Sequence, residues 1–401
     1  MGGIRGSERF QRYSDRIASS LREHNRETHP PDAQKVLRPF SMREAGDFLR
    51  VNPNSFRRYV KTLEGKMPTG TLVNGNRRYF TAEDIAAIQD FLWQDGKLDL
   101  RQYPRRQAHE SLQAITVFNL KGGVSKTTIA TNLGQLLSLR GYRVLLIDLD
   151  AQASMTNLFG LQPEMSPDMP SVYDVIRYDD PVPVREAIRP TYFPRIDILP
   201  ASMDVVEFEY ETALSFRDMA RTAPFHTRIS AALAEVENDY DLVIFDTPPQ
   251  MSFAVISALI ASTGVLIPLN AAMLDVMSLS TFLSMAGDLM AVVEAQSAEK
   301  TFDFLRFLIT RYESTDGPQV QMASYLRTML GDAVMSSALI KSTAINDAAN
   351  TTQPVLEVEP KDFNRRTYER LVESLTQIAD ELERDIYHAW GRTTKELRYG
   401  T

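Results

Sequence analysis

The sequence predicts an α/β protein with a mostly parallel, doubly wound sheet, preceded by a smaller and mainly helical N-terminal domain. From residue 112 onward, short apolar runs typical of buried strands alternate with helical patterns. Before residue 96 the order is instead helix, tight turn, helix, hairpin, helix. Charge divides the chain at the same place: residues 1–110 carry 20 Lys/Arg and 14 Asp/Glu, and the remainder carries 24 and 38. A basic module joined to an acidic one indicates a polyanion as the partner of the first module.

Composition excludes several kinds of site. The 401 residues include no cysteine, which excludes disulfides, thiolate zinc sites and cysteine-ligated iron–sulfur clusters. The chain is 43% hydrophobic and 24% charged, as is ordinary for a globular protein. We expect no membrane span, because no apolar run approaches ~20 residues, and no secretory signal, because the first residues lack an apolar core. A cytoplasmic location is therefore the expectation.

The first 30 residues are predicted to form a separate helix. Phe10, Tyr13, Ile17 and Leu21 recur at helical spacing over residues 9–24, so they lie on one face. Two consecutive prolines then end the pattern. We assign residues 1–30 to this helix, which could serve as a dimerisation arm.

Residues 38–95 are predicted to form a winged helix-turn-helix domain. Ser41 opens a capping box at the start of a first helix, and Asn54 is placed to cap a second. The Asn-Gly pair at 74–75 is a strong hairpin signal, and Thr81 is placed to cap a third helix. This order is the one expected of a winged helix-turn-helix, and the stretch "GNRRYFTAEDI" resembles the MerR-like winged helix.

Four arginines of this domain are predicted to contact DNA. Arg57 and Arg58 lie on the second helix, which would enter a major groove. Arg77 and Arg78 follow the hairpin tip, where a wing would meet phosphate. The alternative is a small structural domain with exposed arginines. Agreement between element order, turn residues and charge favours DNA binding.

A polar segment connects this domain to the α/β domain. Residues 96–111 contain a proline and few apolar side chains, so we predict a linker. Residues 112–401 are assigned to the α/β domain, whose last long helix is expected at about 363–386. Its expected strands are the stretches "QAITVFNL", "YRVLLIDLD", "RIDILPAS", "YDLVIFDTPP", "TGVLIPLN" and "FDFLRFLITRY", with "PVLEVEP" as a late edge candidate.

The stretch "NLKGGVSKTT", residues 119–128, follows the first of these strands and opens a helix, which is the position of a phosphate-binding loop. The common pattern G-x-x-x-x-G-K-[ST] fits only at Lys126 and Thr127, because leucine and serine occupy its glycine positions. Gly122 and Gly123 instead permit close approach of the backbone to phosphate. We predict that Lys126 binds phosphate and that Thr127 supplies a hydroxyl to Mg²⁺.

An additional lysine, Lys121, precedes the glycine pair. The sequence K-G-G-x-x-K-T resembles the deviant Walker A motif of the ParA/MinD ATPase family. This resemblance implies a P-loop fold with ATP/ADP and Mg²⁺ as ligands, and slow ATP hydrolysis that a partner stimulates. It also implies an ATP-dependent homodimer in which Lys121 reaches the nucleotide of the other subunit. The nucleotide-binding residues that it implies are Gly122, Gly123, Val124, Ser125, Lys126, Thr127, Thr128 and Asp148.

Two carboxylate motifs accompany the loop. "DLDAQ" places Asp148 and Asp150 at the end of the second strand, near the expected phosphates. The resemblance implies that Asp150 orients the attacking water and that Asp148 couples the γ-phosphate to conformation; Ala151 stands where family members usually have proline. In "LVIFDTPP" four apolar residues end in Asp246, which we predict to hold the water shell of Mg²⁺ together with Thr127. The predicted catalytic residues are Lys121, Lys126 and Asp150.

Several tasks of this family do not fit the sequence. Nitrogenase iron protein and the cluster-assembly scaffolds need cysteines, MinD needs a terminal amphipathic membrane helix, and the tyrosine kinases of this fold carry a terminal tyrosine cluster. The sequence has no cysteine, and its final stretch "AWGRTTKELRYGT" has neither of the other two features. Two long stretches, "LRGYRVLLIDLDAQASMTNLFG" and "PPQMSFAVISALIASTGVLIPLNAAMLDVMSLSTF", most resemble RepA proteins of RepABC-type plasmids.

This second resemblance implies a plasmid partition ATPase that dimerises on ATP, binds nucleoid DNA non-specifically and represses its own operon through the N-terminal domain. The implied partners are a ParB-like centromere-binding protein and DNA, with a cytoplasmic, nucleoid-associated location and no membrane. Two alternatives stay open: a nucleotide-switched transcriptional regulator, and an ATPase that positions a protein cargo. The candidates for non-specific DNA contacts are Lys341, Arg365, Arg366 and Arg370.

Overall fold

The structure is a computed structural model that describes residues 5–28, 35–73, 75, 77–166, 168–216, 224–295, 299–342, 353–359 and 364–392. The chain forms two compact units, residues 1–36 and residues 37–401. The first unit contains the helix α1 (Gly6–Thr28), which confirms the predicted helix. Phe10, Tyr13 and Ile17 of its apolar face are exposed, and the side chain of Leu21 lies outside the described part.

The α/β domain in the second unit is built on one large sheet. Its strands are β4 (Gln113–Val117), β5 (Val144–Asp148), β6 (Arg189–Pro190), β7 (Ile196–Leu199), β8 (Leu242–Asp246), β9 (Gly264–Asn270), β10 (Phe304–Tyr312) and β11 (Val334–Ile340). Their order is β11-β10-β9-β4-β8-β5-β7-β6, and all neighbours are parallel except β6 and β7. The strands that follow β4 in the chain are therefore added first on one side of it and later on the other. At such a switch point, open α/β sheets bind ligands at the carboxyl ends of the strands.

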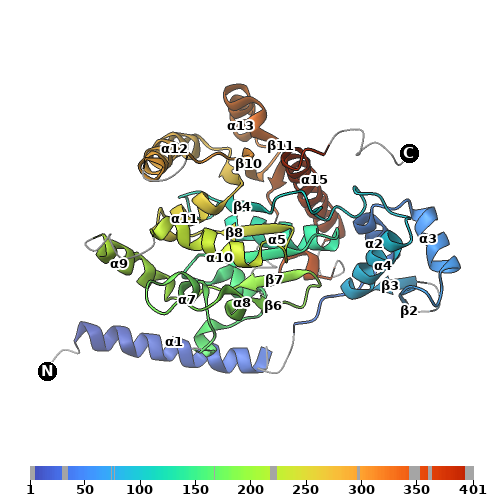
Figure 1. Ribbon diagram of the computed structural model, residues 1–401, viewed down its shortest axis with the longest axis horizontal. Helices are drawn as coiled ribbons and strands as arrows, with labels where there is room; N and C mark the ends of the chain where they lie inside the picture. The colour runs from blue at the N-terminus through green and yellow to red at the C-terminus, as the bar shows by residue number, and fades with distance from the viewer. Residues whose placement is uncertain are drawn as a thin grey trace. The chain divides into compact units, whose positions relative to one another are not determined.

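Helices pack on both faces of this sheet (Figure 1). They are α5 (Lys126–Leu139), α6 (Ser154–Leu158), α7 (Val172–Ile176), α8 (Val184–Ala187), α9 (Val205–Ser215), α10 (Arg228–Val236), α11 (Phe253–Ala261), α12 (Met273–Glu294), α13 (Gly317–Leu330) and α15 (Arg365–Ala389). Short 3₁₀ helices are η1 (Pro163–Met165), η2 (Phe225–Thr227), η3 (Gly331–Ala333) and η4 (Val355–Glu357). Successive strand residues face opposite cores: Leu146 and Ile244 pack in the core with α5 and α15, whereas Leu145 and Val243 pack in the core with α9 and α10. Burial on both faces explains why these strands are uninterrupted apolar runs.

The N-terminal elements of the second unit occur in the predicted order. They are β1 (Phe40–Ser41), α2 (Met42–Leu49), α3 (Pro53–Thr62), β2 (Thr71–Val73), β3 (Arg77–Phe80) and α4 (Ala82–Gln94). The capping boxes of Ser41 with Glu44 and of Thr81 with Asp84 are both present. The strands β2 and β3 form a hairpin, and β1 pairs with β3 to complete a small sheet. Asn74 of the predicted turn lies outside the described residues.

The start of α3 differs from the expectation. Asn54 was expected to cap this helix, but Asn52 does so, because its side chain accepts a hydrogen bond of 2.9 Å from the N–H of Asn54. Pro53 then occupies the first helical position, where its fixed φ and missing N–H are tolerated. The local sequence thus favours a helix that begins two residues earlier.

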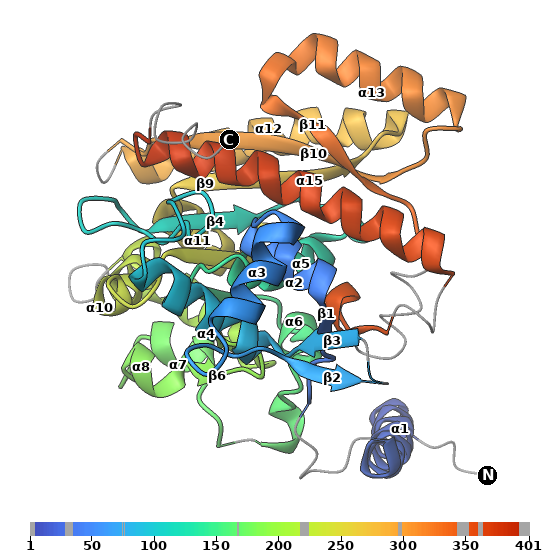
Figure 2. The same cartoon turned by 90° about the vertical axis from the view of Figure 1, so that its right-hand side faces the viewer.

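The N-terminal elements share a core with the α/β domain. Phe40 and Phe56 belong to the same buried cluster as Leu137 of α5 and Leu382 of α15. Figure 2 shows α2, α3 and α4 (blue) beside α5 and the red helix α15. The segment 96–111, predicted as a linker, forms neither helix nor strand, yet its residues Leu98 and Tyr103 are buried. This segment is therefore a packed connection within one unit.

One strand was predicted wrongly and one was missed. The stretch "PVLEVEP" was expected as an edge strand, but Val355–Glu357 forms the 3₁₀ helix η4, and the N–H of Val355 donates to Asn132 of α5. The edge strand next to β10 is β11, which was not predicted from the sequence. Ser336 and Ser337 interrupt the apolar run of β11, and both hydrogen-bond to Glu381 of α15.

One helix of the described part bears on the expectation that the chain has no membrane span. Among the described residues, α12 is long and apolar enough to cross a membrane by length and composition, and little of it is buried. Serines, threonines and acidic residues are dispersed among its apolar residues, so no uninterrupted run marks it in the sequence. Met273, Leu274 and Met277 at its start are exposed.

Candidate functional site

The predicted phosphate loop connects β4 to α5 at the carboxyl edge of the sheet. Two of its residues have left-handed backbone conformations: φ is +75° at Gly123 and +70° at Ser125. A serine in this region costs roughly 1–2 kcal/mol, whereas a glycine adopts it freely. These turns bring Lys126, whose side chain is buried, back over the loop, where its Nζ donates to the carbonyl oxygen of Lys121 at 3.1 Å.

The amide groups of the loop are available to a ligand. The backbone N–H groups of residues 122–125 donate no hydrogen bond to any described part of the chain. They precede the N-terminus of α5, where unpaired amides and the helix dipole favour an anion. Val124 is buried beneath the loop, and the partly exposed Thr127 and Thr128 form the first turn of the helix. The loop therefore fits a bound phosphate group.

Strand register brings two of the predicted carboxylates together. Asp148 ends β5 and Asp246 ends β8, and the two residues are directly opposite in this parallel pair. On the other side of β8, Asp246 is opposite Val117, the last residue of β4 before the phosphate loop. Both aspartates thus lie at the carboxyl edge of the sheet beside the loop, as the sequence predicts.

Asp246 fits a role in holding a cation. Both of its carboxylate oxygens are buried and have no hydrogen-bond partner among the described residues. Burial raises the pKa of Asp246 well above its usual value, and Asp148 raises it further, whereas Thr127 and Lys126 lower it. A buried carboxylate without a partner is costly, and a bound cation would remove that cost.

The number of acidic residues indicates what kind of cation fits. Within the described ranges, no group of three or more His, Asp or Glu side chains is arranged to hold a metal ion. Mg²⁺ commonly takes only one or two carboxylates and completes its octahedral shell with water and substrate phosphate. The residues present therefore fit Mg²⁺ bound together with a nucleotide, which Asp246 and Thr127 would hold.

Asp148 organises the loop that follows it. Its carboxylate accepts hydrogen bonds from the N–H and the hydroxyl of Thr156, at 2.9 and 2.8 Å, and from the N–H of Asp150 at 3.1 Å. Burial raises the pKa of Asp148 to about 6, although the bonds from Thr156 oppose this rise. The Thr156 hydroxyl also accepts from the N–H of Ala201 at 3.0 Å. Sequence reasoning missed Thr156, which carries no motif signal.

Asp150 is more accessible than Asp148. Its side chain is partly exposed, and one carboxylate oxygen accepts a hydrogen bond of 3.0 Å from the N–H of Gln152. Asp150 lies close enough to Lys126 to raise the pKa of that lysine, although burial lowers it by more. A carboxylate beside the phosphate lysine, and open to solvent, can contact a water molecule there.

Lys121 is held by a residue that the sequence analysis did not single out. Its Nζ lies 2.5 Å from Oδ1 of Asp275, at the start of α12. The carboxylate of Asp275 is buried, whereas Lys121 is partly exposed. No local pattern connects these two residues, because the sheet order alone brings α12 next to the phosphate loop.

The predicted DNA-contacting arginines of the N-terminal elements differ in their surroundings. Arg57 and Arg58 are exposed on α3, and Lys61 is exposed one turn further on. Lys61 was missed, although its spacing of three and four residues from the two arginines places it on the same face. In the hairpin, Arg77 is exposed, whereas Arg78 is half-buried and donates to the carbonyl oxygen of Thr69 at 2.8 Å.

The C-terminal candidates for DNA contacts lie near one another, and two of them form ion pairs. Lys341 forms an ion pair with Glu313, and Arg365 pairs with Glu369 at 2.9 Å. Arg366 and Arg370 are exposed near the start of α15. The end of β11 is hydrogen-bonded to α15 at Ser374, one helical turn after Arg370, so Lys341 belongs to the same region.

The chain is similar to proteins of known families. The family model of an AAA domain matches residues 112–296. A protein of Sinorhizobium fredii named "Putative replication protein A" is 42% identical over 383 residues, which cover 94% of this chain and 93% of that protein. Protein SopA of Escherichia coli K12 is 26% identical over 336 residues, 82% of each chain.

A solved structure agrees with the fold. A Borrelia burgdorferi protein described as a plasmid partition protein, bound to AMPPNP, has a TM-score of 0.52 at 21% identity. The match covers 67% of this chain and 99% of that one. Together with the phosphate loop and the parallel sheet, the sequence relatives show that this chain belongs to the ParA family of P-loop partition ATPases, in the branch that includes the replication protein A of rhizobial plasmids.

Proposed function

We propose that the protein is a plasmid partition ATPase that binds ATP with Mg²⁺, dimerises, and hydrolyses ATP slowly. One observation carries the proposal: the open amides of residues 122–125, the buried Lys126 and the unpartnered carboxylate of Asp246 meet at one edge of the sheet. A cradle of amides, a lysine and a carboxylate without a partner are the groups that a Mg²⁺–triphosphate requires.

In the proposed reaction the chain positions groups and neutralises charge. Lys126 and the amides of residues 122–125 bind the β- and γ-phosphates, and Val124, Ser125 and Thr128 hold the loop in its conformation. Asp246 and Thr127 would hold Mg²⁺, which supplies positive charge to the phosphate oxygens when bound. Asp150 orients the attacking water, and Asp148 fixes the intervening loop through Thr156.

We propose that Lys121 completes the site of a second copy of the chain. Two lysines on one triphosphate within one subunit would be largely redundant, whereas one from each subunit couples charge neutralisation to assembly. The exposed Met273, Leu274 and Met277 adjoin Asp275, the partner of Lys121, and support an apolar contact between copies there. The exposed face of α1 supports a second contact, as a dimerisation arm.

The N-terminal elements are proposed to be a winged helix-turn-helix that binds operator DNA and represses the protein's own operon. The exposed cations of α3 support contacts to a major groove, and Arg77 at the hairpin supports a phosphate contact. Arg78 is a weaker candidate, because it already donates to Thr69. Lys341, Arg365, Arg366 and Arg370 are proposed to bind nucleoid DNA without sequence preference.

A measurement of ATP turnover tests the proposal. The purified protein is assayed with Mg²⁺ alone, with DNA, and with DNA and a ParB-like centromere-binding protein. We expect slow basal hydrolysis that both additions raise. If turnover stays unchanged while ATP alters operator binding, the protein is a nucleotide-switched regulator. If DNA does not raise turnover and ATP does not alter operator binding, positioning of a protein cargo becomes the better assignment.

A further inference from the structure

The N-terminal elements contact the end of α5 that lies opposite the phosphate loop. This helix begins at Lys126 and ends at Leu139, so its 14 residues span about 21 Å. Arg140 is its C-cap residue. A single rigid element therefore has the phosphate site at one end and the N-terminal elements at the other.

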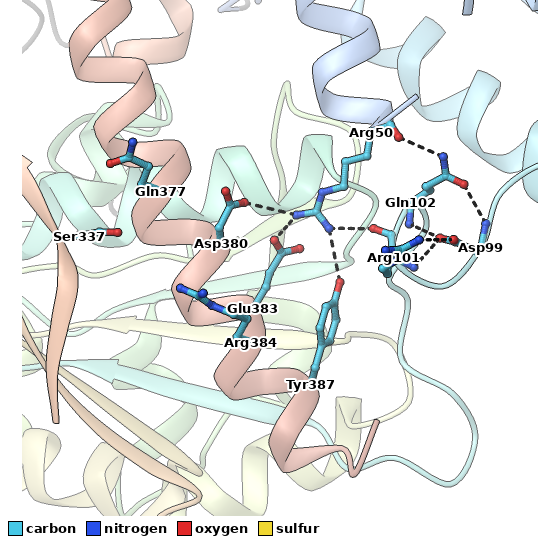
Figure 3. Close-up of a pocket in the computed structure, with 10 residues that line it drawn as sticks. All are labelled: Arg50, Asp99, Arg101, Gln102, Ser337, Gln377, Asp380, Glu383, Arg384 and Tyr387. Carbon is cyan, nitrogen blue, oxygen red and sulfur yellow. Dashed lines mark hydrogen bonds and ion pairs between the residues drawn. The ribbon is translucent and has the colours of Figure 1, made fainter. Parts of the chain in front are cut away.

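One buried carboxylate is shared by an arginine from each side of this contact. Glu383 of α15 forms ion pairs with Arg140, which follows α5, and with Arg50, which follows α2. Figure 3 shows the pair with Arg50. Asp380, one turn earlier on α15, lies 2.6 Å from Arg140 and 3.8 Å from Arg50. We call these four residues the arginine–carboxylate cluster. Its two positive and two negative charges balance, and the side chains of Glu383 and Arg140 are almost fully buried.

Arg50 is fixed on its other side as well. Its backbone is left-handed, with φ of +51°, which is strained for a residue other than glycine. Its guanidinium donates to the carbonyl oxygen of Arg101 at 2.8 Å, and its own carbonyl accepts from Gln102 at 3.0 Å. Arg50 thus joins three segments: the end of α2, the connection at 99–102, and α15.

A second polar contact, from α4, is made to the same end of α5. Gln89 of α4 is fully buried, and its Nε2 donates to the carbonyl oxygen of Leu139 at 2.9 Å. Arg195, which directly precedes β7, donates to the Gln89 side chain and lies 2.8 Å from Asp90. The last turn of α5 is therefore bonded to α4 directly and to α2 through Glu383.

The gap between α2 and α15 is not filled by apolar side chains. A cleft of about 570 Å³ lies there, and its ten lining residues, shown in Figure 3, are all polar or charged. The phosphate loop does not line it. At this place, contact between α2 and α15 therefore depends on the arginine–carboxylate cluster.

We propose that the arginine–carboxylate cluster and Gln89 couple the nucleotide site to the N-terminal elements. A nucleotide that draws the phosphate loop and the start of α5 toward it would also shift Arg140 and the Leu139 carbonyl, because both lie at the other end of the same helix. Buried hydrogen bonds are directional, and a buried charge that loses its partner is costly, so these contacts either move together or break. In both cases α2 and α4 respond to the nucleotide. This inference rests on the proposed nucleotide site, and it adds a route from that site to the DNA-binding face.

Hydrogen–deuterium exchange of the full chain, with and without Mg²⁺-ATP, tests the coupling. The test variant is Arg50→Gln, which leaves Arg140 paired with both acidic residues. It removes the ion pair between Glu383 and the end of α2, together with the guanidinium's bond to Arg101. The matched control is Asp385→Asn, because Asp385 is also on α15 but pairs with Arg306 of β10. Glu383→Gln is a second test variant, and its folding is checked by circular dichroism.

In the wild type and in Asp385→Asn, we expect ATP to change exchange both at residues 119–128 and at residues 42–62. In Arg50→Gln, we expect the change at 119–128 to persist, with ATP affinity within about twofold of the wild type, and the change at 42–62 to fall by at least half. If ATP changes residues 42–62 equally in Arg50→Gln, or leaves them unchanged in the wild type, the coupling is refuted. If ATP leaves even residues 119–128 unchanged, the proposed nucleotide site fails, and the coupling fails with it.

Discussion

Lys121 and Asp275 of the same subunit form an ion pair, with Nζ 2.5 Å from Oδ1. The carboxylate is 7% exposed and the lysine 44%, so one partner is buried and the other can leave. If Lys121 contacts the nucleotide of a second subunit, this intrasubunit pair has to break first. The pair therefore opposes assembly until the competing negative charge of a triphosphate is present.

Variants of this pair are expected to shift dimerisation in opposite directions. Lys121→Ala monomers should bind ATP but fail to dimerise and hydrolyse poorly, whereas Asp275→Asn should dimerise at lower ATP concentrations, because Lys121 is released. Analytical ultracentrifugation across an ATP titration measures both effects. Mixing Lys121→Ala with Asp150→Ala should restore turnover, because one site of the heterodimer then has both groups. If heterodimers form without activity, Lys121 does not act between subunits.

Lys126→Ala is expected to abolish ATP binding, because the phosphates lose their main point charge. Isothermal titration calorimetry with Mg²⁺-ATP measures this loss directly. Lys66→Ala, which changes an exposed lysine of the N-terminal elements, serves as the control and should bind as the wild type does. Unchanged affinity in Lys126→Ala would show that the loop is not a phosphate site.

Asp150→Ala is expected to keep ATP binding and dimerisation but to stop hydrolysis, since Asp150 is partly exposed beside Lys126. Single-turnover assays with labelled ATP separate binding from chemistry. Asp148→Ala should differ, because it removes the anchor of Thr156 and should also lower the thermal stability. Normal steady-state turnover of Asp150→Ala would exclude this residue from the mechanism.

Asp246→Asn is expected to stabilise the nucleotide-free protein. A folded-state pKa raised above the unfolded value means that the folded chain binds the proton more readily, so stability falls as pH rises through the window between the two values. Above that window the buried charge costs roughly 1–3 kcal/mol, and removing it should raise the midpoint of thermal unfolding by several degrees. Differential scanning calorimetry at roughly pH 5 and pH 8 should show the larger gain at the higher pH, where the buried carboxylate is more fully charged.

The same variant should lose the response to Mg²⁺. In the wild type, Mg²⁺-ATP should raise the unfolding midpoint above that with ATP alone, because ligands stabilise the state that binds them. In Asp246→Asn the two midpoints should coincide. A full Mg²⁺ response in this variant would mean that another residue holds the cation.

Arg57→Ala and Arg58→Ala are expected to weaken operator binding and to leave ATP hydrolysis intact. A base-edge contact contributes ~1–3 kcal/mol, whereas the loss of a phosphate contact mainly lowers the salt dependence. Footprinting over the protein's own promoter at several salt concentrations distinguishes the two. Arg43→Ala, an exposed arginine on α2, is the matched control. Equal protection by all variants would argue that α3 does not contact the operator.

Local sequence determined the phosphate loop, the capping boxes and most of the strands. Gly122, Gly123, Lys126 and Thr127 are close neighbours in the chain, and their conformation depends on turns and a helix start that a few residues specify. The buried strands are apolar on both faces, so each forms a continuous run that is visible without knowledge of its partners. Local sequence missed β11, whose serines interrupt its apolar run, because an edge position tolerates polar residues that a central strand does not. It also wrongly predicted a strand in "PVLEVEP", where Val355–Glu357 forms a 3₁₀ helix.

Only the tertiary structure decided which distant residues meet. Strand order sets Asp148 opposite Asp246 and brings Asp275 to Lys121. Packing of the N-terminal elements on α5 places Gln89 at the last turn of that helix. Each of these contacts joins segments far apart in the chain, and a single sequence carries no local signal for them. Their energies depend on burial, which raises the cost of an unpaired charge and strengthens a matched pair, and burial exists only after the sheet and its helices have assembled.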